Sequence, residues 1–375
     1  MRRVYYLTGT RADFGLMRST LEKIHTSTDL ALGVMVTGMH LDPRYGQTVR
    51  EIEASGLPIV ARIPVPLNGN DGAAMAKAIA AALAGSVDAL AAGRPDALLV
   101  LGDRGEMLAG ALAALHLNIP VVHLHGGELS GTVDEPVRHA ISKLAHYHFV
   151  ATQKSRDRLV RMGEPADSVF VTGAPGLDDL NPKGTTPRAD LMRAAGFDPA
   201  RPIALVVFHP VVQDAAVAGD QARDLLSAVA DVEGLQGLFF LPNADAGSEA
   251  IRSVFENAGG RFQSRVHLER ATFHDWLAAA DVLVGNSSSG IIEAASFGLP
   301  VVNVGDRQRN RERNANVRDV PPARTSVAAA VRDALRGGRQ RASNVYGDGR
   351  AGERVVDLLR RLPMGAEILR KQNAY

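Results

Sequence analysis

The chain has 375 residues, no cysteine and a formal net charge of +1. This length exceeds one ordinary hydrophobic core, so we expect two domains. The lack of cysteine excludes disulfides, thiolate nucleophiles and cysteine metal sites, and the small net charge gives no reason to expect a nucleic-acid or anionic-membrane partner. The first residues enter a strand pattern without the apolar region of a signal peptide, and no run approaches ~18 uninterrupted apolar residues, so a cytoplasmic protein is the expectation.

Apolar strand-like runs alternate with amphipathic helical patterns along the first half of the chain. Strands are predicted at 4–9, 30–38, 58–65, 97–102, 119–125, 146–152 and 168–174. Helices are predicted at about 13–27, 45–55, 71–93, 105–116, 134–145 and 153–163. This βα repetition is typical of a parallel, doubly wound sheet.

A segment rich in proline and glycine, 177–202, interrupts the pattern and is interpreted as the connection into a second domain. There the pattern resumes, with strands predicted at 203–209, 237–243, 265–269, 281–285 and 300–305, and helices at about 218–231, 245–259, 273–279, 289–298, 324–336 and 353–362. The predicted fold class is therefore α/β, with two Rossmann-like parallel-sheet domains that face a cleft. We expect domains at 1–178 and 179–355, and a C-terminal helix and tail, 356–375, that packs back on the first domain.

The stretch 119–143, IPVVHLHGGELSGTVDEPVRHAISK, predicts a buried strand, a glycine turn and a helix opened by Asp134. It gathers His123, His125, Glu128 and Asp134 at the carboxyl edge of a sheet, where ligands bind in open α/β folds. His123 and His125 alternate along the predicted strand, so their side chains are expected on one face. The alternative for Asp134 is a helix N-cap with no chemical role.

A second polar cluster, GDRGEM at 102–107, follows a fully apolar strand. Asp103 is a candidate general base beside Arg104, and the alternative is a structural ion pair that caps the next helix. A metal site with His123, His125, Asp103 and Glu128 is conceivable from the residue types, but one core histidine and one pocket histidine explain the pattern better, and we expect no metal.

The first strand leads into GTRADFG at 9–15, where Arg11 and backbone amides are placed to hold a diphosphate at a helix N-terminus. The alternative is a βα turn with a surface arginine. The motif is not G-x-G-x-x-G, and G-x-x-x-x-G-K-[ST] is absent from the chain. Dinucleotide-dependent hydride transfer and P-loop phosphoryl transfer therefore lack their usual signatures.

The strongest pattern in the second half is GNSSSGIIEAASFGLP at 285–300. Serine hydroxyls and unpaired amides at a helix N-terminus form a phosphate cradle, and Glu293 lies one turn further, where it can accept from ribose hydroxyls. The alternative is a serine N-cap with nothing bound. Other candidate phosphate, uracil or ribose contacts are Arg138 in the first half and His209, Asn243 and Arg307 in the second.

Taken together, these motifs resemble the hydrolysing UDP-N-acetylglucosamine 2-epimerases, which share a two-domain glycosyltransferase-B-type fold with the non-hydrolysing enzymes. The match runs to about residue 320 through GTRADFG, GMHLDPRYG, GDRGE, HGGELSGTVDE, FHP, PNADAGS and GNSSSGIIEA. The resemblance implies that UDP leaves C1 as the C2 proton is removed, giving a 2-acetamidoglycal. Water then adds with inverted configuration at C2, and the free sugar and UDP are released.

The resemblance also assigns roles by position. Asp103 and Asp134 match the acid/base carboxylates, and Arg104 and His123 line the same pocket. The positions that match UDP or sugar contacts are Arg11, His40, His209, Asn243, Ser287, Ser288, Glu293 and Arg307. It implies no cofactor, a UDP-sugar as the partner molecule, and a homo-oligomer.

Two positions depart from the family pattern. Many members read H-x-E-G-G-E, and here His125 stands where the first Glu provides a third catalytic carboxylate. Either His125 or Glu128 takes over that proton transfer, or the sugar differs; a neutral histidine is a suitable acid/base near pH 7. Asn310 stands where glycine is common, and asparagine tolerates a left-handed backbone.

The expected function is a hydrolysing UDP-N-acetylglucosamine 2-epimerase that supplies an N-acetylmannosamine-type precursor of a nonulosonic acid. The alternative substrate is UDP-2,4-diacetamido-2,4,6-trideoxyglucose, also called UDP-N,N'-diacetylbacillosamine, on the route to legionaminic acid. A non-hydrolysing epimerase, a glycosyltransferase of the same fold and a UDP-sugar sensor are the remaining candidates. The sensor is disfavoured because a binder of a dianion gains nothing from several buried carboxylates.

Overall fold

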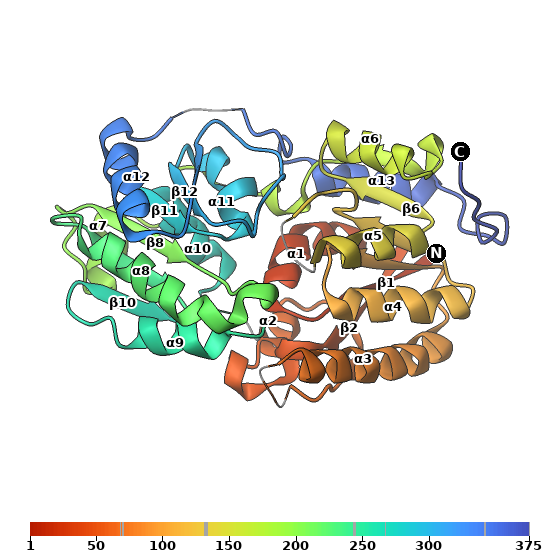
Figure 1. Ribbon diagram of the computed structural model, residues 1–375. Helices are drawn as coiled ribbons and strands as arrows, with labels where there is room; N and C mark the ends of the chain where they lie inside the picture. The colour runs from red at the N-terminus through yellow and green to blue at the C-terminus, as the bar shows by residue number, and fades with distance from the viewer. Residues whose placement is uncertain are drawn as a thin grey trace. The chain divides into compact units, whose positions relative to one another are not determined.

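A computed structural model of the chain describes residues 1–67, 69, 71–130, 134–242, 245–266, 268–340 and 343–374. The chain forms two compact units (Figure 1). The first unit comprises Met1–Glu128, Val133–Asp179 and Tyr346–Tyr375, and the second comprises Leu129–Thr132 and Leu180–Val345. From the sequence we expected one domain to end at residue 178 and the next at residue 355.

The first unit is built on a seven-stranded parallel sheet with the strand order β3-β2-β1-β4-β5-β6-β7. In chain order its strands are β1 (Arg2–Thr8), β2 (Leu30–Thr37), β3 (Ile59–Ile63), β4 (Ala97–Leu101), β5 (Val121–Leu124), β6 (Tyr147–Val150) and β7 (Val169–Val171). The central strands β4 and β5 are buried throughout, which explains why they read as continuous apolar runs. Because β4 and β5 are neighbours, their carboxyl ends meet at one edge of the sheet.

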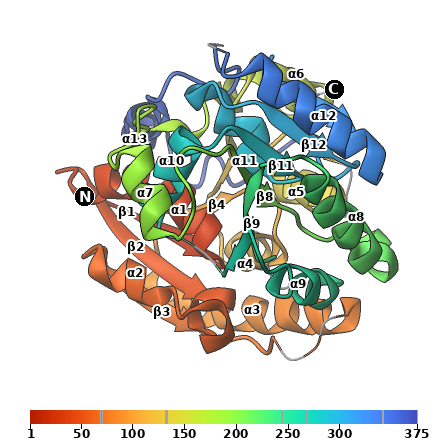
Figure 2. The same ribbon diagram turned by 90° about the vertical axis from the view of Figure 1, so that its left-hand side faces the viewer.

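Helices cover both faces of this sheet. Alternate residues along β4 point to opposite cores: Leu99 packs with helices α1 (Arg11–His25) and α2 (Val49–Ala54) and the last helix α13 (Ala351–Arg361). Leu98 packs on the other face with α3 (Gly72–Gly93), α4 (Gly105–His116) and α5 (Asp134–Leu144), which Figure 1 shows in a row. In the turned view of Figure 2, α2, β3 and α3 lie together near the edge of the sheet. Helix α6 (Gln153–Arg161) packs beside β7.

The second unit repeats this architecture with a six-stranded parallel sheet of order β10-β9-β8-β11-β12-β13. Its strands are β8 (Ile203–Val207), β9 (Gln236–Phe240), β10 (Phe262–Arg265), β11 (Val282–Gly285), β12 (Val301–Val304) and β13 (Val317–Val320). One face carries α8 (Ala218–Ala230), α9 (Ser248–Glu256) and α12 (Arg324–Gly337), and the other carries α7 (Arg188–Ala194) and α10 (Arg270–Ala279). The predicted fold class, two parallel-sheet α/β units, is confirmed.

The elements that differ from the prediction lie mainly at sheet edges and in the connection. The two outermost strands of the second sheet, β10 and β13, are polar edge strands: β10 ends at Arg265, where the predicted 265–269 begins, and β13 was not predicted. Edge strands carry charges that oppose aggregation, so apolar periodicity does not mark them. Helix α7 lies inside the predicted connection, where Pro187 precedes its first turn.

The helix predicted at 289–298 is also shorter than expected. It is divided into α11 (Ser288–Ile292) and a 3₁₀ turn, Ala294–Phe297. The side-chain amides of Asn314 and Asn344 donate to the carbonyls of Ile291 and Ile292, at 3.0 and 2.7 Å. These carbonyls are the ones that a continuing α-helix would bond four residues later, so the two asparagines end it.

A buried ion cluster ties the C-terminal tail to the first unit. Glu164 has no exposed side-chain surface and lies 2.7 Å from Lys143, 2.6 Å from Lys371 and 3.0 Å from His148. Burial raises the pKa of this carboxyl, but the hydrogen bonds from His148, Lys143 and Lys371 outweigh burial and lower it to about 2. The carboxylate therefore stays ionised in the folded protein far below neutral pH.

We expect Glu164→Gln to lower the free energy of unfolding at pH 7 by about 3 kcal/mol, because it removes the buried counter-charge of Lys371 and Lys143. A carboxyl whose folded pKa is depressed stabilises the fold above its unfolded pKa, which is near 4.5. That contribution is lost as pH falls from about 4.5 toward 2, so the difference between wild type and variant should shrink over this window. Urea unfolding at several pH values measures it, with the exposed Glu256→Gln as control; a difference independent of pH would contradict the expectation.

Within the described ranges, one helix, α3, is long and apolar enough to cross a membrane by length and composition, with a mean hydropathy of 1.4 in its best window. A single helix of this kind is weak evidence, since helices of soluble proteins also pass the same test. In the first unit α3 packs against α4 and β3.

Candidate active site

The carboxyl ends of β4 and β5 bring the predicted acid/base residues of the first unit together. Asp103 follows β4 and accepts a hydrogen bond from the guanidinium of Arg138, which lies on α5 with only 1% of its side chain exposed. A second nitrogen of Arg138 donates to the backbone carbonyl of Glu128 at 3.1 Å. Arg138, predicted as a phosphate contact or a solvated residue, is thus a buried link between Asp103 and the loop after β5. Asp134 is the first residue of α5, half-buried, one turn before Arg138.

The loop after β5 holds a histidine–carboxylate pair. His125 Nδ1 lies 2.5 Å from Glu128 Oε1, and both residues are buried. His125 lies just beyond the strand, with a left-handed backbone at φ 61°, so it does not share a strand face with His123 as predicted. Non-glycine residues in this conformation are uncommon and cluster at functional sites.

Glycine makes the sharp turn of this loop possible. Gly127 has φ 74°, and a Cβ at this position would lie 2.5 Å from the carbonyl oxygen of Ser155 on α6. Arg158, also on α6, donates to the carbonyl of Gly127. The close packing on α6 therefore fixes where His125 and Glu128 point.

His123 is a structural member of this group. It is fully buried, and burial lowers its pKa to about 3, so the ring is neutral at pH 7. Its Nε2 donates to the carbonyl of Gly102 at 2.7 Å, and its Nδ1 accepts from the hydroxyl of Ser142 at 3.0 Å. With both nitrogens occupied, His123 holds the residue before Asp103 and is not itself open to a ligand.

Of the substrate contacts predicted near the β1–α1 turn, Arg11 is partly exposed and His40 is buried. Arg11, at the N-terminus of α1, donates from Nε to Glu51 at 2.6 Å, while one of its terminal nitrogens is buried with no partner among the described residues. His40 is fully buried between the hydroxyls of Thr8 and Thr48, at 2.9 and 2.8 Å. Burial lowers the pKa of His40 to about 4. These contacts argue against direct substrate contact by His40.

Arg104, the N-cap residue of α4, lies next to Asp103 and is partly exposed. Its Nε donates to Glu106 at 3.3 Å. The ion pair between Asp103 and Arg104, which was the alternative reading of this motif, is replaced by Asp103–Arg138 and Arg104–Glu106. The pairing of Asp103 with Arg138 was not recognised from the sequence, because Arg138 is distant in the chain.

In the second unit, Asn286 organises the strand ends. Its side-chain oxygen accepts from the backbone N–H of His209, and its amide donates to the carbonyl of His209, both at 2.8 Å. Arg307 donates to the carbonyl of Asn286 at 3.2 Å. Gly285 allows this approach, because a Cβ there would lie 2.1 Å from the carbonyl of Val207. Asn286 was quoted within GNSSSG but not singled out, although its place directly after a strand was a usable signal.

The other predicted contacts of this unit surround the same edge. Ser287 is the N-cap of α11 and its hydroxyl bonds that of Ser289 at 2.8 Å, while Ser288 begins the five-residue helix. Glu293 is buried and lies 3.0 Å from Arg270 and 3.4 Å from His274. Burial raises the pKa of Glu293, but Arg270 and His274 outweigh burial and hold the pKa below its usual value. Asn243 lies outside the described residues.

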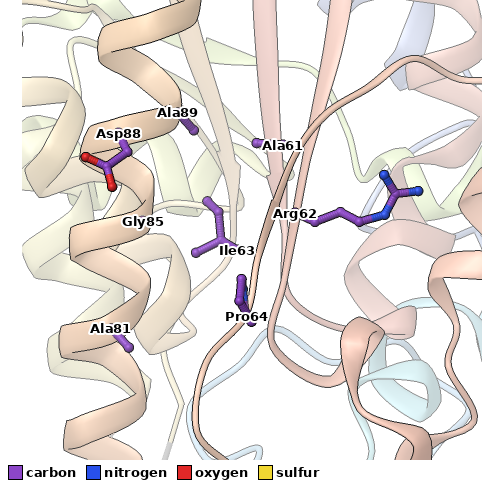
Figure 3. A pocket seen from close by; sticks show the side chains of 8 residues that line it. All are labelled: Ala61, Arg62, Ile63, Pro64, Ala81, Gly85, Asp88 and Ala89. Carbon is purple, nitrogen blue, oxygen red and sulfur yellow. The ribbon is translucent and has the colours of Figure 1, made fainter.

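No group of three or more His, Asp or Glu side chains in the part of the chain that the structure describes is arranged to hold a metal ion. A cavity of about 520 Å³ lies between β3 and α3 (Figure 3). Its lining contains none of the predicted site residues: Ala61, Arg62, Ile63, Pro64, Ala81, Gly85, Asp88 and Ala89. The candidate active site is therefore defined by the strand ends and not by this cavity.

Comparison with known proteins decides the family. The family model described as UDP-N-acetylglucosamine 2-epimerase matches residues 22–360. This chain belongs to that family. A UDP-N,N'-diacetylbacillosamine 2-epimerase (hydrolyzing) of Legionella pneumophila is 50% identical over 377 residues, which cover 100% of both chains. A UDP-N-acetylglucosamine 2-epimerase of Neisseria meningitidis is 32% identical and covers 93% of this chain and 92% of its own.

A solved structure shows the same fold for a family member. The crystal structure of a UDP-GlcNAc 2-epimerase from Neisseria meningitidis bound to UDP-GlcNAc matches with a TM-score of 0.79 at 19% identity, and covers 95% of this chain and 99% of that chain. The family model confirms the resemblance drawn from the motifs. The solved structure confirms the expected two-unit fold of this chain.

Proposed function

We propose that this member of the family is a hydrolysing UDP-sugar 2-epimerase that acts on a UDP-2-acetamido sugar. The observation that supports the proposal best is the group at the ends of β4 and β5, where the buried guanidinium of Arg138 links Asp103 to the loop that carries the His125–Glu128 pair, and Asp134 begins the same helix. Several acid/base side chains on one sheet edge fit a reaction that must remove and return a proton at C2.

The proposed reaction has two steps, an elimination and a hydration. In the first, a base takes the C2 proton, the C1–O bond to UDP breaks, and a C1–C2 double bond forms. In the second, water adds its oxygen to C1 and a proton is delivered to C2 on the opposite face. Asp103 is proposed to take or deliver a proton in these steps, since Arg138 holds its carboxylate in place after the end of β4. Asp134 is proposed as its partner.

The His125–Glu128 pair is proposed to replace the third carboxylate of the family. Glu128 accepts from Nδ1, which fixes the ring and leaves Nε2 for the substrate; no described residue bonds Nε2. The ring can thus carry a proton in the manner of a carboxylate-oriented histidine. Because histidine is neutral when deprotonated, this site has one negative charge fewer than the H-x-E-G-G-E arrangement.

The second unit is proposed to hold UDP. Helix-terminal amides and hydroxyls at Ser287 and Ser288, with Arg307, suit a diphosphate, and Glu293 suits ribose hydroxyls. The paired Arg270 keeps Glu293 ionised as an acceptor. His209 is held by Asn286 at the end of β8.

Two substrates are proposed for direct comparison. UDP-N-acetylglucosamine is the substrate expected from the motifs, and the family description supports it. UDP-N,N'-diacetylbacillosamine is supported by the name of the 50% identical relative. The test is to incubate the protein with each and follow UDP and free sugar by NMR, including the C2 configuration. Consumption of neither sugar, or a product still bonded to UDP, would refute the proposal.

We expect Asn286→Ala to weaken UDP binding by about tenfold, corresponding to about 1.4 kcal/mol. The substitution removes both bonds to the backbone of His209 and leaves a partly buried N–H without its partner. Titration calorimetry with UDP measures the change, and Asn257→Ala, an exposed asparagine just after α9, is the control. Unchanged UDP affinity in Asn286→Ala would show that the two hydrogen bonds between Asn286 and His209 do not shape the nucleotide site.

A further inference from the structure

The C-terminal tail contributes a partly buried lysine to the end of α5, the helix that carries Asp134 and Arg138. Lys371 Nζ lies 3.0, 2.9 and 2.6 Å from the backbone carbonyl oxygens of Ser142, Lys143 and Ala145. These carbonyls belong to the last turn of α5 and the residue after it, where a helix leaves carbonyls without a partner four residues later; the carbonyl of Ser142 also accepts from the N–H of Ala145 at 3.3 Å. A cation at this end also complements the helix dipole. Lys371 therefore caps α5 from a segment more than two hundred residues later in the chain.

Several contacts hold the tail in place. The carboxylate of Glu164 lies 2.6 Å from Lys371 and 2.7 Å from Lys143. Lys143 also donates to the side-chain oxygen of Asn373 at 2.6 Å, and the backbone N–H of Ala374 donates to the carbonyl of Gly163 at 2.8 Å. The fully buried Glu164 thus anchors the lysine against the helix end.

Helix α5 carries the groups proposed for proton transfer. Asp134 is its first residue, and Arg138, one turn later, binds Asp103 and the carbonyl of Glu128. Arg138 is almost fully buried, so a shift of α5 along its axis has to move Asp103 or break their bond.

A second, shorter connection runs from the capped end to Asp103. Ser142, whose carbonyl is bound by Lys371, also bonds Nδ1 of His123 through its hydroxyl. His123 in turn donates to the carbonyl of Gly102, the residue before Asp103. Among the described residues, only Ser142 and Gly102 form hydrogen bonds with the buried, neutral ring of His123.

We infer that Lys371 is a positioning residue of the active site, which fixes α5 and the Ser142–His123–Gly102 chain so that Asp134 and Asp103 meet the substrate. Lys371 does not itself bond either carboxylate. The expected effect of Lys371 on turnover rests on the proposed function. The expected effect of Lys371 on α5 does not.

The test compares Lys371→Met, Lys371→Arg and the neighbouring tail variant Arg370→Met in the full-length protein. For Lys371→Met we expect kcat to fall about 10- to 100-fold while KM stays unchanged, because acid/base groups are misplaced and the nucleotide contacts are not. Hydrogen exchange of the amides in α5 should become faster in the same variant. Lys371→Arg should restore most of kcat, and Arg370→Met should behave as wild type.

The inference is overturned if Lys371→Met keeps wild-type kcat, even with a lower melting temperature, since that would be a stabilising role alone. It is also overturned if exchange in α5 does not change. If the wild-type protein consumes neither UDP-sugar, the proposed function fails, and the exchange of α5 still decides whether Lys371 holds the helix.

Discussion

Asp103→Asn should lower kcat about 1,000-fold or more, while UDP still binds. A positioned acid/base group contributes about 10²–10⁴ to rate, and asparagine keeps the size of the side chain but cannot exchange the proton. Asp103 is also the ionised partner of the buried Arg138, so the substitution removes the local counter-charge. Steady-state release of UDP from both candidate substrates measures the loss.

The control for this variant separates chemistry from folding. The nucleotide contacts proposed for the second unit do not involve Asp103, so UDP affinity by calorimetry should stay within error of wild type. Asp88→Asn, an exposed aspartate on α3, should change neither quantity. If Asp103→Asn retained turnover, or if it lost UDP binding to the same degree, Asp103 would not be the acid/base group of this site.

His125→Gln should lower kcat by about 100-fold or more, and Glu128→Gln by a smaller factor, if the ring carries the proton and the carboxylate orients it. Glutamine at His125 keeps a polar side chain but has no titratable nitrogen. In Glu128→Gln the ring remains but loses the charged acceptor at 2.5 Å. Steady-state release of UDP from both candidate substrates measures the two losses.

The order of the two effects is the informative result. A larger loss in Glu128→Gln than in His125→Gln would assign the proton transfer to Glu128, with the histidine as its orienting partner. The exposed His116→Gln, at the end of α4, is the matched control and should leave turnover unchanged. Wild-type turnover in both His125→Gln and Glu128→Gln would remove the pair from the mechanism.

The architecture could be predicted because the central strands are buried on both faces. Runs such as 97–102 and 119–125 had to be parallel core strands, and neighbouring strands bring Asp103 and His125 to one edge. Asn310 was expected to tolerate a left-handed backbone where the family commonly has glycine, and it adopts φ 65°. The strands could be read from local composition, which the tertiary structure did not override, and the backbone of Asn310 from comparison with the family pattern.

The pairing of charges could not be predicted in the same way. Arg104 is adjacent to Asp103 in sequence, yet Asp103 pairs with Arg138, because the fold brings this residue of α5 next to Asp103. His125 was assigned to the strand by alternation, but the chain turns one residue earlier. Nothing local indicated that Lys371 would reach α5, since a lysine near a C-terminus is ordinarily solvated.

The central claim is that groups of the first unit exchange the proton at C2. The most direct test is to run the reaction in deuterated water. The account predicts that the free sugar released with UDP carries deuterium at C2 in essentially every molecule, since the proton removed in the elimination is replaced from solvent. Mass spectrometry and NMR of the product read this out. A free sugar that keeps its original hydrogen at C2 would contradict the account, because UDP would then have been lost by simple hydrolysis or transfer.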